Sequence, residues 1–448
     1  MIILGLGTNL GDRLANLRAA LHKLKTHEKV NVHSVSPVYV SEAMIPENAP
    51  ANWQQPFFNA AVACNSHLQP LQLLRELKKI ETTLGRVSAK NWAPRVIDID
   101  ILMWNNISYQ STELTIPHPG LAERPFALWP LMDVYSTWSY PHELLESWGS
   151  RFSGEAPFHT RQLPYRIDGS VFVGILNITP DSFSDGGEFF VADAPVAQAK
   201  KLFMAGAEII DIGAESTRPG SQAISATEEW ERLQIPLQTI LDFYANKSFK
   251  PRISIDTRNY QVAKKAIAVG VNWINDVSGF TDPRMLAAVR DSNVRLVCVH
   301  SLSLPPIPQE VIPRDQDPVA YLLQWGEKKL HDLQQRGIAN SRVILDTGIG
   351  FGKTPEQSLT LIKRASQFKQ LGVPIMIGHA RKSFHKVITN MPAVQRDLET
   401  AISTIDLFAQ EIDYIRVHQV GYNIRAVAMQ KRLNATTTNS NHDYTQFK

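Results

Sequence analysis

The sequence has few cysteines, little net charge and no long apolar run, and each absence excludes a class of protein. Cys64 and Cys298 are the only cysteines among 448 residues and form no CxxC pair, which excludes a zinc–cysteine cluster and a disulfide framework. The formal net charge of +3 argues against a nucleic-acid-coating surface. No uncharged apolar stretch approaches the roughly 20 residues that span a bilayer, and the first residues do not resemble a signal peptide. We therefore expect a cytoplasmic protein with neither membrane nor nucleic acid as partner.

The length of the chain favours two or three domains, because one ordinary core rarely grows so large. Gly, Pro and polar residues follow one another without a period between residues 150 and 168, which indicates a connection. The predicted organisation is a first domain of residues 1–154, a linker of residues 155–168, a second domain of residues 169–433, and a polar, disordered tail of residues 434–448.

The first domain mixes strand-like and helix-like segments in irregular order. Helical periodicity occurs in residues 14–27 and 70–85, and strand-like patterns occur in residues 1–7, 30–40, 57–65 and 95–104. Several strands between two or three helices predict an α+β sandwich with a largely antiparallel sheet.

The second domain is regular, with eight strand-like runs separated by helix-like segments. This pattern predicts a TIM (β/α)8 barrel, with a doubly wound open sheet as the alternative. Polar residues at or just after the strand ends favour the barrel, because all eight ends meet at one mouth there. These residues are Asn177, Asp211, Asp256, Asn275, His300, Asp346, Arg381 with Lys382, and Arg416 with His418.

A pair of aspartates is the sharpest local motif of the first domain. Asp98 and Asp100 lie two positions apart on a predicted strand, so they share one face while Ile97, Ile99 and Ile101 share the other. Two adjacent carboxylates repel unless a cation joins them, and Mg²⁺ with substrate phosphates suits that arrangement. The alternative is a pair of solvated aspartates on an edge strand.

Basic and aromatic residues surround this pair in the sequence. Arginine suits bidentate contacts with phosphate, and an aromatic ring with an amide suits a flat heterocycle. Taken singly, Phe57 also fits core packing and His118 also fits an exposed loop. The candidates are Arg86, Trp92, Arg95, Arg124, His118, Phe57 and Asn59.

The first domain resembles 6-hydroxymethyl-7,8-dihydropterin pyrophosphokinase through GLGTNLGDRLANL, FFNAAV, GRV, NWAPRVIDIDIL and LTIPHPGLAERPFALWPL. The resemblance implies a ferredoxin-like α+β fold that transfers pyrophosphate from ATP, with Mg²⁺ at Asp98 and Asp100. It implies a pterin between Phe57 and Phe126, hydrogen-bonded to Asn59. It also implies that Trp92 belongs to a mobile lid, and that ATP or the transferred group is contacted by Arg86, Arg95, His118 and Arg124. The chain departs from the family at Ser88, where arginine is frequent, and at Phe57, where tyrosine is common.

Candidate ligands of a second site lie at the strand ends of the second domain. Asp256, Asn275 and Asp346 suit the donors of a pterin ring, although each alone also suits a helix N-cap or a turn. Glycine-containing loops follow two strands, and the second loop carries Thr217 and Arg218. Cations that can neutralise a pyrophosphate leaving group are Lys382, Arg416 and His418.

The second domain resembles dihydropteroate synthase through NITPDSFSDGG, IIDIGAESTRPG, SIDT, INDVSG, LDTGIGFGK, ARKS and IRVH. The resemblance implies that Asn177 holds Mg²⁺ on the pyrophosphate, and that Asp256, Asn275, Asp346 and Lys382 bind the pterin. It also implies that Thr217, Arg416 and His418 face the phosphates, and that p-aminobenzoate is flanked by Phe183, Arg218, Phe351 and Ser383. The chain departs from the family at Thr347, where proline is usual, and in residues 297–308.

Together the two resemblances imply a bifunctional enzyme of folate biosynthesis whose partners are the pterin alcohol, ATP and p-aminobenzoate, with a homodimer through the barrel as one arrangement. Two alternatives are a corrinoid methyltransferase and a pterin-binding protein without activity. The ARKS motif argues against the first, and the intact Asp98, Asp100, Asn177, Arg218 and Lys382 argue against the second.

Overall fold

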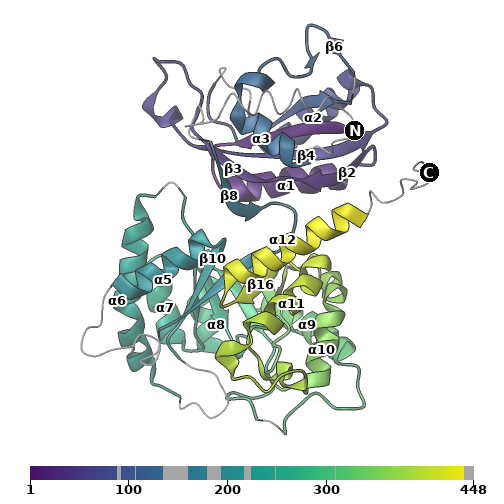
Figure 1. The fold of residues 1–448 in the computed structure, drawn as a ribbon. Helices are drawn as coiled ribbons and strands as arrows, with labels where there is room; N and C mark the ends of the chain where they lie inside the picture. The colour runs from purple at the N-terminus through teal and green to yellow at the C-terminus, as the bar shows by residue number, and fades with distance from the viewer. Residues whose placement is uncertain are drawn as a thin grey trace, which may run out of the picture. The chain divides into compact units, whose positions relative to one another are not determined.

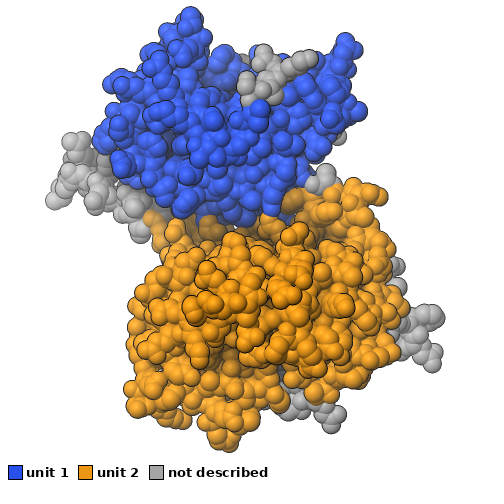
Figure 2. Space-filling view, turned by 180° about the vertical axis from the view of Figure 1, so that it is seen from behind, with its two compact units in different colours: residues 1–168 blue, residues 169–448 orange. Residues whose placement is uncertain are grey.

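The computed structural model describes residues 1–87, 92–105, 107–134, 160–178, 193–215, 223–247, 249–307 and 309–437. The chain divides into two compact units, residues 1–168 (unit 1) and residues 169–448 (unit 2), coloured blue and orange in Figure 2. The division falls between Asp168 and Gly169.

Unit 1 is built on a six-stranded antiparallel sheet with the order β5-β1-β4-β3-β8, and β2 also pairs with β4 (Figure 1). Helix α1 contacts β1, β2 and β4, and helix α3 packs on β3 and β4, so the sheet is the middle layer of the predicted α+β sandwich. The strands are β1 (Ile2–Thr8), β2 (Val30–Val35), β3 (Pro37–Ser41), β4 (Phe57–Ser66), β5 (Asp98–Trp104), β6 (Tyr109–Gln110), β7 (Thr115–Ile116) and β8 (Arg161–Arg166); the helices are α1 (Arg13–Lys25), α2 (Pro70–Thr83) and α3 (Pro125–Val134).

Local signals explain where these elements begin and end. The Asp12 side chain accepts from the backbone N–H of Ala15 at the start of α1, and α2 begins with Pro70 between the capping-box residues Gln69 and Gln72. The single strand predicted over residues 30–40 is interrupted at Ser36, which separates β2 from β3. Both pieces still pair with β4, so the predicted antiparallel sheet is confirmed.

Strand β8 occupies residues that the sequence assigns to a linker. Its backbone pairs with β3, the side chains of Leu163 and Tyr165 are buried, and Arg166 donates to the carbonyl of Val35 at 2.5 Å. The prediction of an irregular connection over residues 155–168 is therefore corrected for residues 161–166. Only residues 167–170 lie between β8 and the first strand of unit 2.

Unit 2 is a closed barrel of eight parallel strands, each followed by a helix outside the strands, which confirms the predicted TIM barrel (Figure 1). The strands are β9 (Val171–Asn177), β10 (Ile209–Gly213), β11 (Arg252–Asp256), β12 (Trp273–Asp276), β13 (Arg295–Val299), β14 (Val343–Asp346), β15 (Ile375–Ile377) and β16 (Tyr414–Val417). The helices are α5 (Asp193–Met204), α6 (Ala226–Ala245), α7 (Tyr260–Ala268), α8 (Pro283–Arg290), α9 (Pro318–Gln335), α10 (Pro355–Lys363), α11 (Asp397–Ala409) and α12 (Val420–Thr437).

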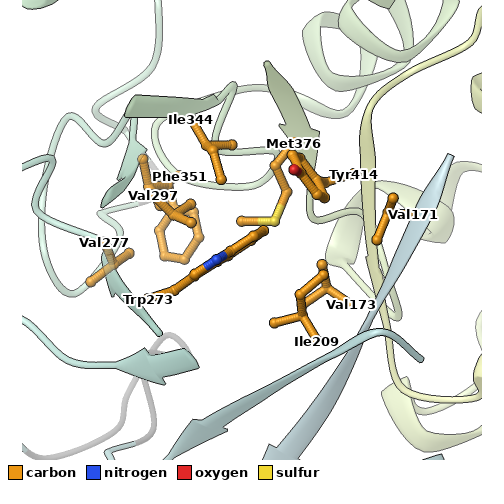
Figure 3. Packing of buried hydrophobic residues seen from close by; sticks show 11 residues of the cluster. Val171, Val173, Ile209, Trp273, Val277, Val297, Ile344, Phe351, Met376 and Tyr414 are labelled. Carbon is orange, nitrogen blue, oxygen red and sulfur yellow. The ribbon is translucent and has the colours of Figure 1, made fainter. Parts of the chain in front are cut away.

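Apolar side chains fill the interior of the barrel. Figure 3 shows the Trp273 indole reaching across the centre, with Phe351 and Val297 to one side and Val173 and Ile209 to the other. Two residues further along several of these strands the interior side chain becomes polar, because positions two apart point to the same face. A polar layer therefore lies on top of the apolar core, at the carboxyl ends of the strands.

The chain beyond this barrel begins as helix. Helix α12 continues to Thr437, so the tail predicted as disordered from Asn434 starts in a helical turn, and residues 438–448 lie outside the described residues. Within the described ranges, no helix combines the length and the apolar character that a membrane crossing needs.

The pairing of β8 leads to a test on fragments of unit 1. Compared with residues 1–168, residues 1–160 lose the buried Leu163 and Tyr165, which should lower the free energy of unfolding by about 3 kcal/mol or more. Urea denaturation followed by circular dichroism would measure the difference. Equal stability of the two fragments would show that β8 is dispensable.

Candidate active sites

The aspartate pair of unit 1 lies opposite two glycines. In the register of β5 with β1, Asp98 faces Gly7 and Asp100 faces Gly5, so their partners on β1 place no side chain beside the carboxylates. A Cβ at Gly7 would come within 3.4 Å of the Asn59 amide oxygen. The glycines therefore keep open the space over this face of the sheet.

A pocket of about 140 Å³ occupies that space. Its lining includes most of the residues that the sequence marks in the first domain, from β4, β5 and the start of α3, and the exposed Trp92 at its rim. His118 does not line it, although its charge interacts with that of Asp100. The predicted residues that the structure brings together here are Phe57, Asn59, Trp92, Arg95, Asp98, Asp100, Arg124 and Phe126.

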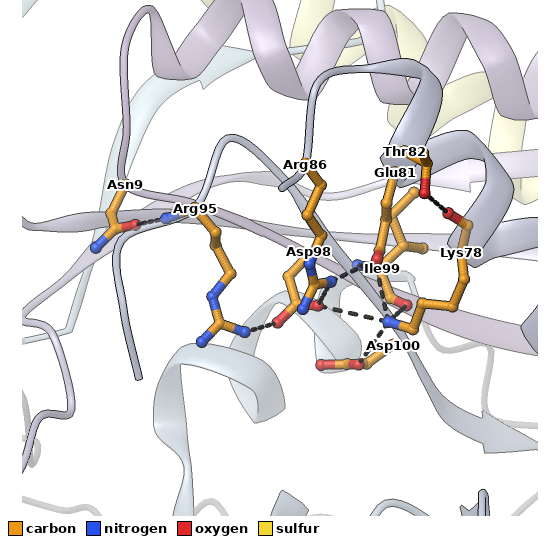
Figure 4. Close-up of polar contacts among 9 residues, drawn as sticks. All are labelled: Asn9, Lys78, Glu81, Thr82, Arg86, Arg95, Asp98, Ile99 and Asp100. Carbon is orange, nitrogen blue, oxygen red and sulfur yellow. Dashed lines mark hydrogen bonds and ion pairs between the residues drawn. The ribbon is translucent and has the colours of Figure 1, made fainter. Parts of the chain in front are cut away.

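Two arginines hold Asp98 from both sides (Figure 4). The Arg86 guanidinium donates to Oδ1 of Asp98, and the Arg95 guanidinium donates to Oδ2. The backbone N–H of Arg95 also donates to the Asn9 side chain at 2.8 Å, which fixes the segment before β5 against the end of β1. The predicted proximity of Arg86 and Arg95 to the aspartates is therefore present in the structure.

Two residues of α2 complete this cluster, and the sequence analysis did not identify them. Lys78 Nζ lies 2.7 Å from Glu81 Oε1, 3.6 Å from Asp98 Oδ1 and 3.9 Å from Asp100 Oδ1. Glu81 is buried, accepts from the backbone N–H of Ile99 at 2.6 Å, and accepts from Arg86 at 2.5 Å. Their spacing of three positions on a helix was the available signal, but many exposed pairs share it.

The two aspartates differ in their electrostatics. Burial would raise the pKa of Asp98, but the charges of Lys78, Arg95 and Arg86 hold that pKa below its ordinary value. Asp100 keeps 44% of its side-chain surface accessible, yet protein atoms surround its carboxyl; this desolvation, followed by repulsion from Asp98, raises its pKa. Asp100 is therefore less well neutralised by neighbouring positive charge than Asp98 is.

Oxygen-ligand chemistry at this pair fits a hard divalent cation. The two carboxylates share one strand face beside an open pocket, where substrate phosphates can supply further oxygens. Among the described residues, no group of three or more His, Cys, Asp or Glu side chains forms a self-sufficient metal site. A metal bound here would therefore depend on the substrate for part of its coordination.

In unit 2 the polar layer is centred on Arg416. Its Nε donates to Asp211 Oδ2 at 2.6 Å and its Nη2 donates to Asp256 Oδ2 at 2.8 Å. Asn275 donates to the same Asp211 oxygen at 2.9 Å. Asp211 is almost completely buried and organises the layer, although the sequence analysis assigned it no role beyond its place at a strand end.

Buried carboxyls at the mouth have raised pKa values. Desolvation raises the pKa of Asp256 to about 7 against the opposing charge of Arg416, although 24% of its side-chain surface faces the mouth. Burial also raises the pKa of Asp346, whose Oδ1 accepts from the N–H of Gly348 at 2.7 Å. Among the described residues, Asn275 Oδ1 is buried and has no hydrogen-bond partner, which suits a site that receives donors from a ligand.

Lys382 and Phe351 form one wall of this site. The Lys382 ammonium lies 4.0 Å from the centroid of the Phe351 ring. Behind the ring, buried Lys353 donates to the carbonyl of Phe351 and contacts His300 Nδ1, both at 2.9 Å. Burial lowers the pKa of Lys353 to about 7, well below the ordinary value of a lysine.

The backbone at Lys382 is held by the first turn of α11. Arg381 adopts a left-handed conformation with φ 58°, which is unfavourable for a residue other than glycine. Its side chain makes two hydrogen bonds of 2.7 Å with Asp397, and its N–H donates to Thr400 at 3.1 Å. Arg396 donates to the carbonyl of Lys382 at 3.2 Å. The loop conformation therefore depends on a neighbouring helix.

The remaining predicted residues are placed as follows. Asn177 is exposed at the end of β9, Ser383 is exposed just after Lys382, and His418 directly follows β16. Ser88, Phe183, Thr217 and Arg218 lie outside the described residues. The structure thus brings together Asp256, Asn275, Asp346, Lys382, Phe351 and Arg416 within one barrel mouth.

Two protein families match the chain, one in each unit. The family described as 7,8-dihydro-6-hydroxymethylpterin-pyrophosphokinase matches residues 3–136, and the family described as pterin binding enzyme matches residues 173–418. The folate synthesis bifunctional protein of Chlamydia muridarum is 38% identical over 442 residues, which are 95% of this chain and 97% of that protein. The mitochondrial folate synthesis bifunctional protein of Pisum sativum is 34% identical, over 96% of this chain and 88% of its own length.

Solved structures similar to this chain include two dihydropteroate synthases. The enzyme from Anaplasma phagocytophilum with bound 6-hydroxymethylpterin-monophosphate has a TM-score of 0.53 and 33% identity, covering 59% of this chain and 99% of its own. The enzyme from Xanthomonas albilineans with 4-aminobenzoic acid has a TM-score of 0.54 and 30% identity, covering 60% of this chain and 94% of its own.

The bonds of Arg416 lead to a prediction about stability and pH. Arg416→Leu leaves two carboxylates without their cation, which should lower the free energy of unfolding of unit 2 by about 3–5 kcal/mol. Without the cation the pKa of Asp256 should rise above its wild-type value of about 7, so near neutral pH the folded variant should bind more protons than the folded wild type. The stability deficit should therefore be nearly constant below pH 6 and grow as the pH rises through 7. Urea denaturation at several pH values would measure it.

Arg364→Leu is the matched control, because its bond to Asp317 is also 2.6 Å long but both side chains are over one third exposed. It should lower the free energy of unfolding by less than about 1 kcal/mol. A pH-independent deficit for Arg416→Leu would contradict the assignment of paired carboxylates.

Proposed function

The chain belongs to the family of bifunctional folate-synthesis proteins, and from this premise we propose how its residues divide between the two reactions. The first activity transfers pyrophosphate from ATP to 6-hydroxymethyl-7,8-dihydropterin and releases AMP. The second joins the pterin pyrophosphate to p-aminobenzoate, giving 7,8-dihydropteroate and pyrophosphate. Unit 1 matches the pyrophosphokinase family, and unit 2 matches the pterin-binding family and resembles dihydropteroate synthase structures.

In the pyrophosphokinase reaction, unit 1 orients two substrates and supplies positive charge. The pterin lies between Phe57 and Phe126, and the Asn59 amide, one N–H of which donates to Ser41 at 3.0 Å, hydrogen-bonds to its edge. The pterin hydroxymethyl oxygen attacks the β-phosphorus of ATP. Arg86 and Arg95, which are hydrogen-bonded to Asp98 in this structure, stabilise the transferring group. Arg124 and His118 contact ATP, and Trp92 covers the pocket.

Mg²⁺ is the proposed metal of this reaction, with Asp98 and Asp100 as its ligands. When bound, it would neutralise phosphate charge and hold the ATP phosphates in line for attack. The carboxylate pair and the shortage of positive charge at Asp100 support this assignment. In unit 2, the amide oxygen of Asn177 would be the corresponding Mg²⁺ ligand.

In the synthase reaction, the barrel mouth holds the pterin and stabilises the departing pyrophosphate. Asp256, Asn275 and Asp346 accept the hydrogen-bond donors of the pterin, and Lys382 contacts both ring and leaving group. A guanidinium has five N–H donors, so Arg416 can bind phosphate beside its two carboxylates, together with His418 and Thr217. The p-aminobenzoate nitrogen then attacks the pterin methylene, flanked by Phe183, Arg218, Phe351 and Ser383.

The polar layer on the barrel core is the observation that carries the synthase assignment. It combines buried acceptors for a flat heterocycle with cations for an anionic leaving group in one mouth. A corrinoid methyltransferase and an inactive binding protein are weaker candidates, because the chain also matches the pyrophosphokinase family that makes this substrate. Both cysteines are free and buried, which supports our proposal of a reducing, cytoplasmic setting.

Paired substitutions test the division of labour. Asp98→Asn should lower ATP-dependent pyrophosphoryl transfer at least about 100-fold and leave synthesis from supplied pterin pyrophosphate unchanged, because its carboxylate serves one unit only. Lys382→Ala should do the reverse. AMP release and dihydropteroate formation, measured separately on each purified variant, report the two activities. Loss of both activities in either folded variant would overturn the assignment.

We also propose that the barrel forms a homodimer through α11. Val394, Leu398 and Ile402 follow one another at four-residue spacing and are 59%, 69% and 59% exposed. Exposed Ile388 and Met391 lie just before them in the chain. Val394 lies in the short turn before α11, and Leu398 and Ile402 lie on the face of α11 opposite its buried residues. An exposed apolar row of this kind is typical of a contact with a second copy of the chain.

Charge placed on this row should prevent association. Leu398→Glu combined with Ile402→Glu should shift the mass from dimer to monomer in size-exclusion chromatography with light scattering, because burying two carboxylates opposes the contact. Ile235→Glu is the control, since Ile235 is a singly exposed residue of α6 at 63%. A monomeric wild-type protein, or a double variant that stays dimeric, would refute this interface.

A further inference from the structure

Lys78 is one of the cations of the aspartate cluster, and the proposed mechanism gives it no role. Its ammonium lies between helix α2 and strand β5, within 4 Å of both Asp98 and Asp100 (Figure 4). We propose that Lys78 is the resident counter-cation of the Asp98–Asp100 pair, and that its charge sets how tightly this pair takes up Mg²⁺. This inference rests on the proposed metal site of the pyrophosphokinase.

The ammonium is held in place although the side chain is 42% exposed. Nζ donates to Glu81 Oε1 at 2.7 Å and to the backbone carbonyl of Ile99 at 3.3 Å. Ile99 stands between the two aspartates in β5, and its N–H donates to the same oxygen of Glu81. Lys78 is thus fixed to the strand that carries the proposed ligands, and is not merely a flexible surface lysine nearby.

The distribution of charge shows why Lys78 matters most for Asp100. The cluster holds three carboxylates, on Glu81, Asp98 and Asp100, and three cations, on Lys78, Arg86 and Arg95. The two arginines are bonded to Asp98. Among the described residues, Lys78 is the ion-pair partner that approaches Asp100. Without Lys78, Asp98 would keep its two arginine partners, and Asp100 would lose the cation that offsets its repulsion from Asp98.

A divalent cation and the ammonium interact with the same carboxylates. Their charges have the same sign, so an ammonium fixed beside the site opposes metal binding, while it stabilises the carboxylates when no metal is bound. Replacing Lys78 by an uncharged residue should therefore act in opposite directions on two quantities. The metal-free protein should become less stable, and its affinity for Mg²⁺ should rise.

The chain provides a matched control on the same helix. Lys79 pairs with Glu76 at 2.8 Å across the same three-residue spacing, but its side chain is 71% exposed and carries no contact to the aspartates. Lys78→Met and Lys79→Met in the full chain therefore remove the same group from equivalent helical pairs. Lys78→Arg keeps the charge and should behave as the wild type.

Two readouts other than turnover test the proposal. Isothermal titration calorimetry with Mg²⁺, in the presence of α,β-methylene-ATP, should give a dissociation constant that is roughly tenfold lower in Lys78→Met than in the wild type. Without divalent cation, the melting temperature of unit 1 should be lower by roughly 4–8 °C, and saturating Mg²⁺ should narrow this gap. Lys79→Met should show neither change.

The outcomes separate the inference from its premise. If the wild type binds Mg²⁺ with the ATP analogue and Lys78→Met binds it no more tightly, the role of Lys78 is overturned while the metal site stands. If the Asp98→Asn variant binds Mg²⁺ as tightly as the wild type does, the proposed metal site itself fails. Should Lys78→Met be too unstable to titrate, Lys78→Gln provides the same loss of charge, with a side chain that can still donate to Glu81.

Discussion

Both sites depend on the two-residue period of a β-strand. In β5 this period sets Asp98 and Asp100 side by side on one face and sends Ile99 and Ile101 into the core. In the barrel it places Asp211 after Ile209, Asn275 after Trp273, Asp346 after Ile344 and Arg416 after Tyr414, all directed to the interior. Each of these four barrel strands thus contributes one apolar residue to the core and one polar residue to the mouth, and a shift of register by one position would destroy both.

The features that could be predicted from the sequence are local patterns, and those that could not are contacts between segments far apart in the chain. The spacing of Asp98 and Asp100, the eight strand–helix repeats and the polar strand ends are local patterns, and the structure contains all three. Lys78 could not be found in this way, because its contact with Asp98 depends on how α2 packs against β5. Strand β8 was missed for a similar reason: its partner β3 lies more than a hundred residues earlier, and its own sequence, RQLPYR, contains a proline and little apolar periodicity.

The two sites treat buried charge differently. In unit 1, three cations balance three carboxylates beside an open pocket, and two of those cations are arginines suited to phosphate. In unit 2, one arginine serves two buried carboxylates, and Asp256 and Asp346 retain raised pKa values. The first unit thus provides one cation for each carboxylate, and the second gathers its carboxylates around one guanidinium.

Strand β8 bears on how such a chain can be divided or joined in evolution. Residues 167–170 alone separate the last strand of the first sheet from the first strand of the barrel. A break in the coding sequence upstream of this interval removes an edge strand from the pyrophosphokinase, and a break downstream removes a strand from the barrel. Gene fission that preserves two complete folds is therefore confined to four codons, so random breakage would rarely separate the two enzymes intact. This architecture makes the fusion easier to keep than to undo.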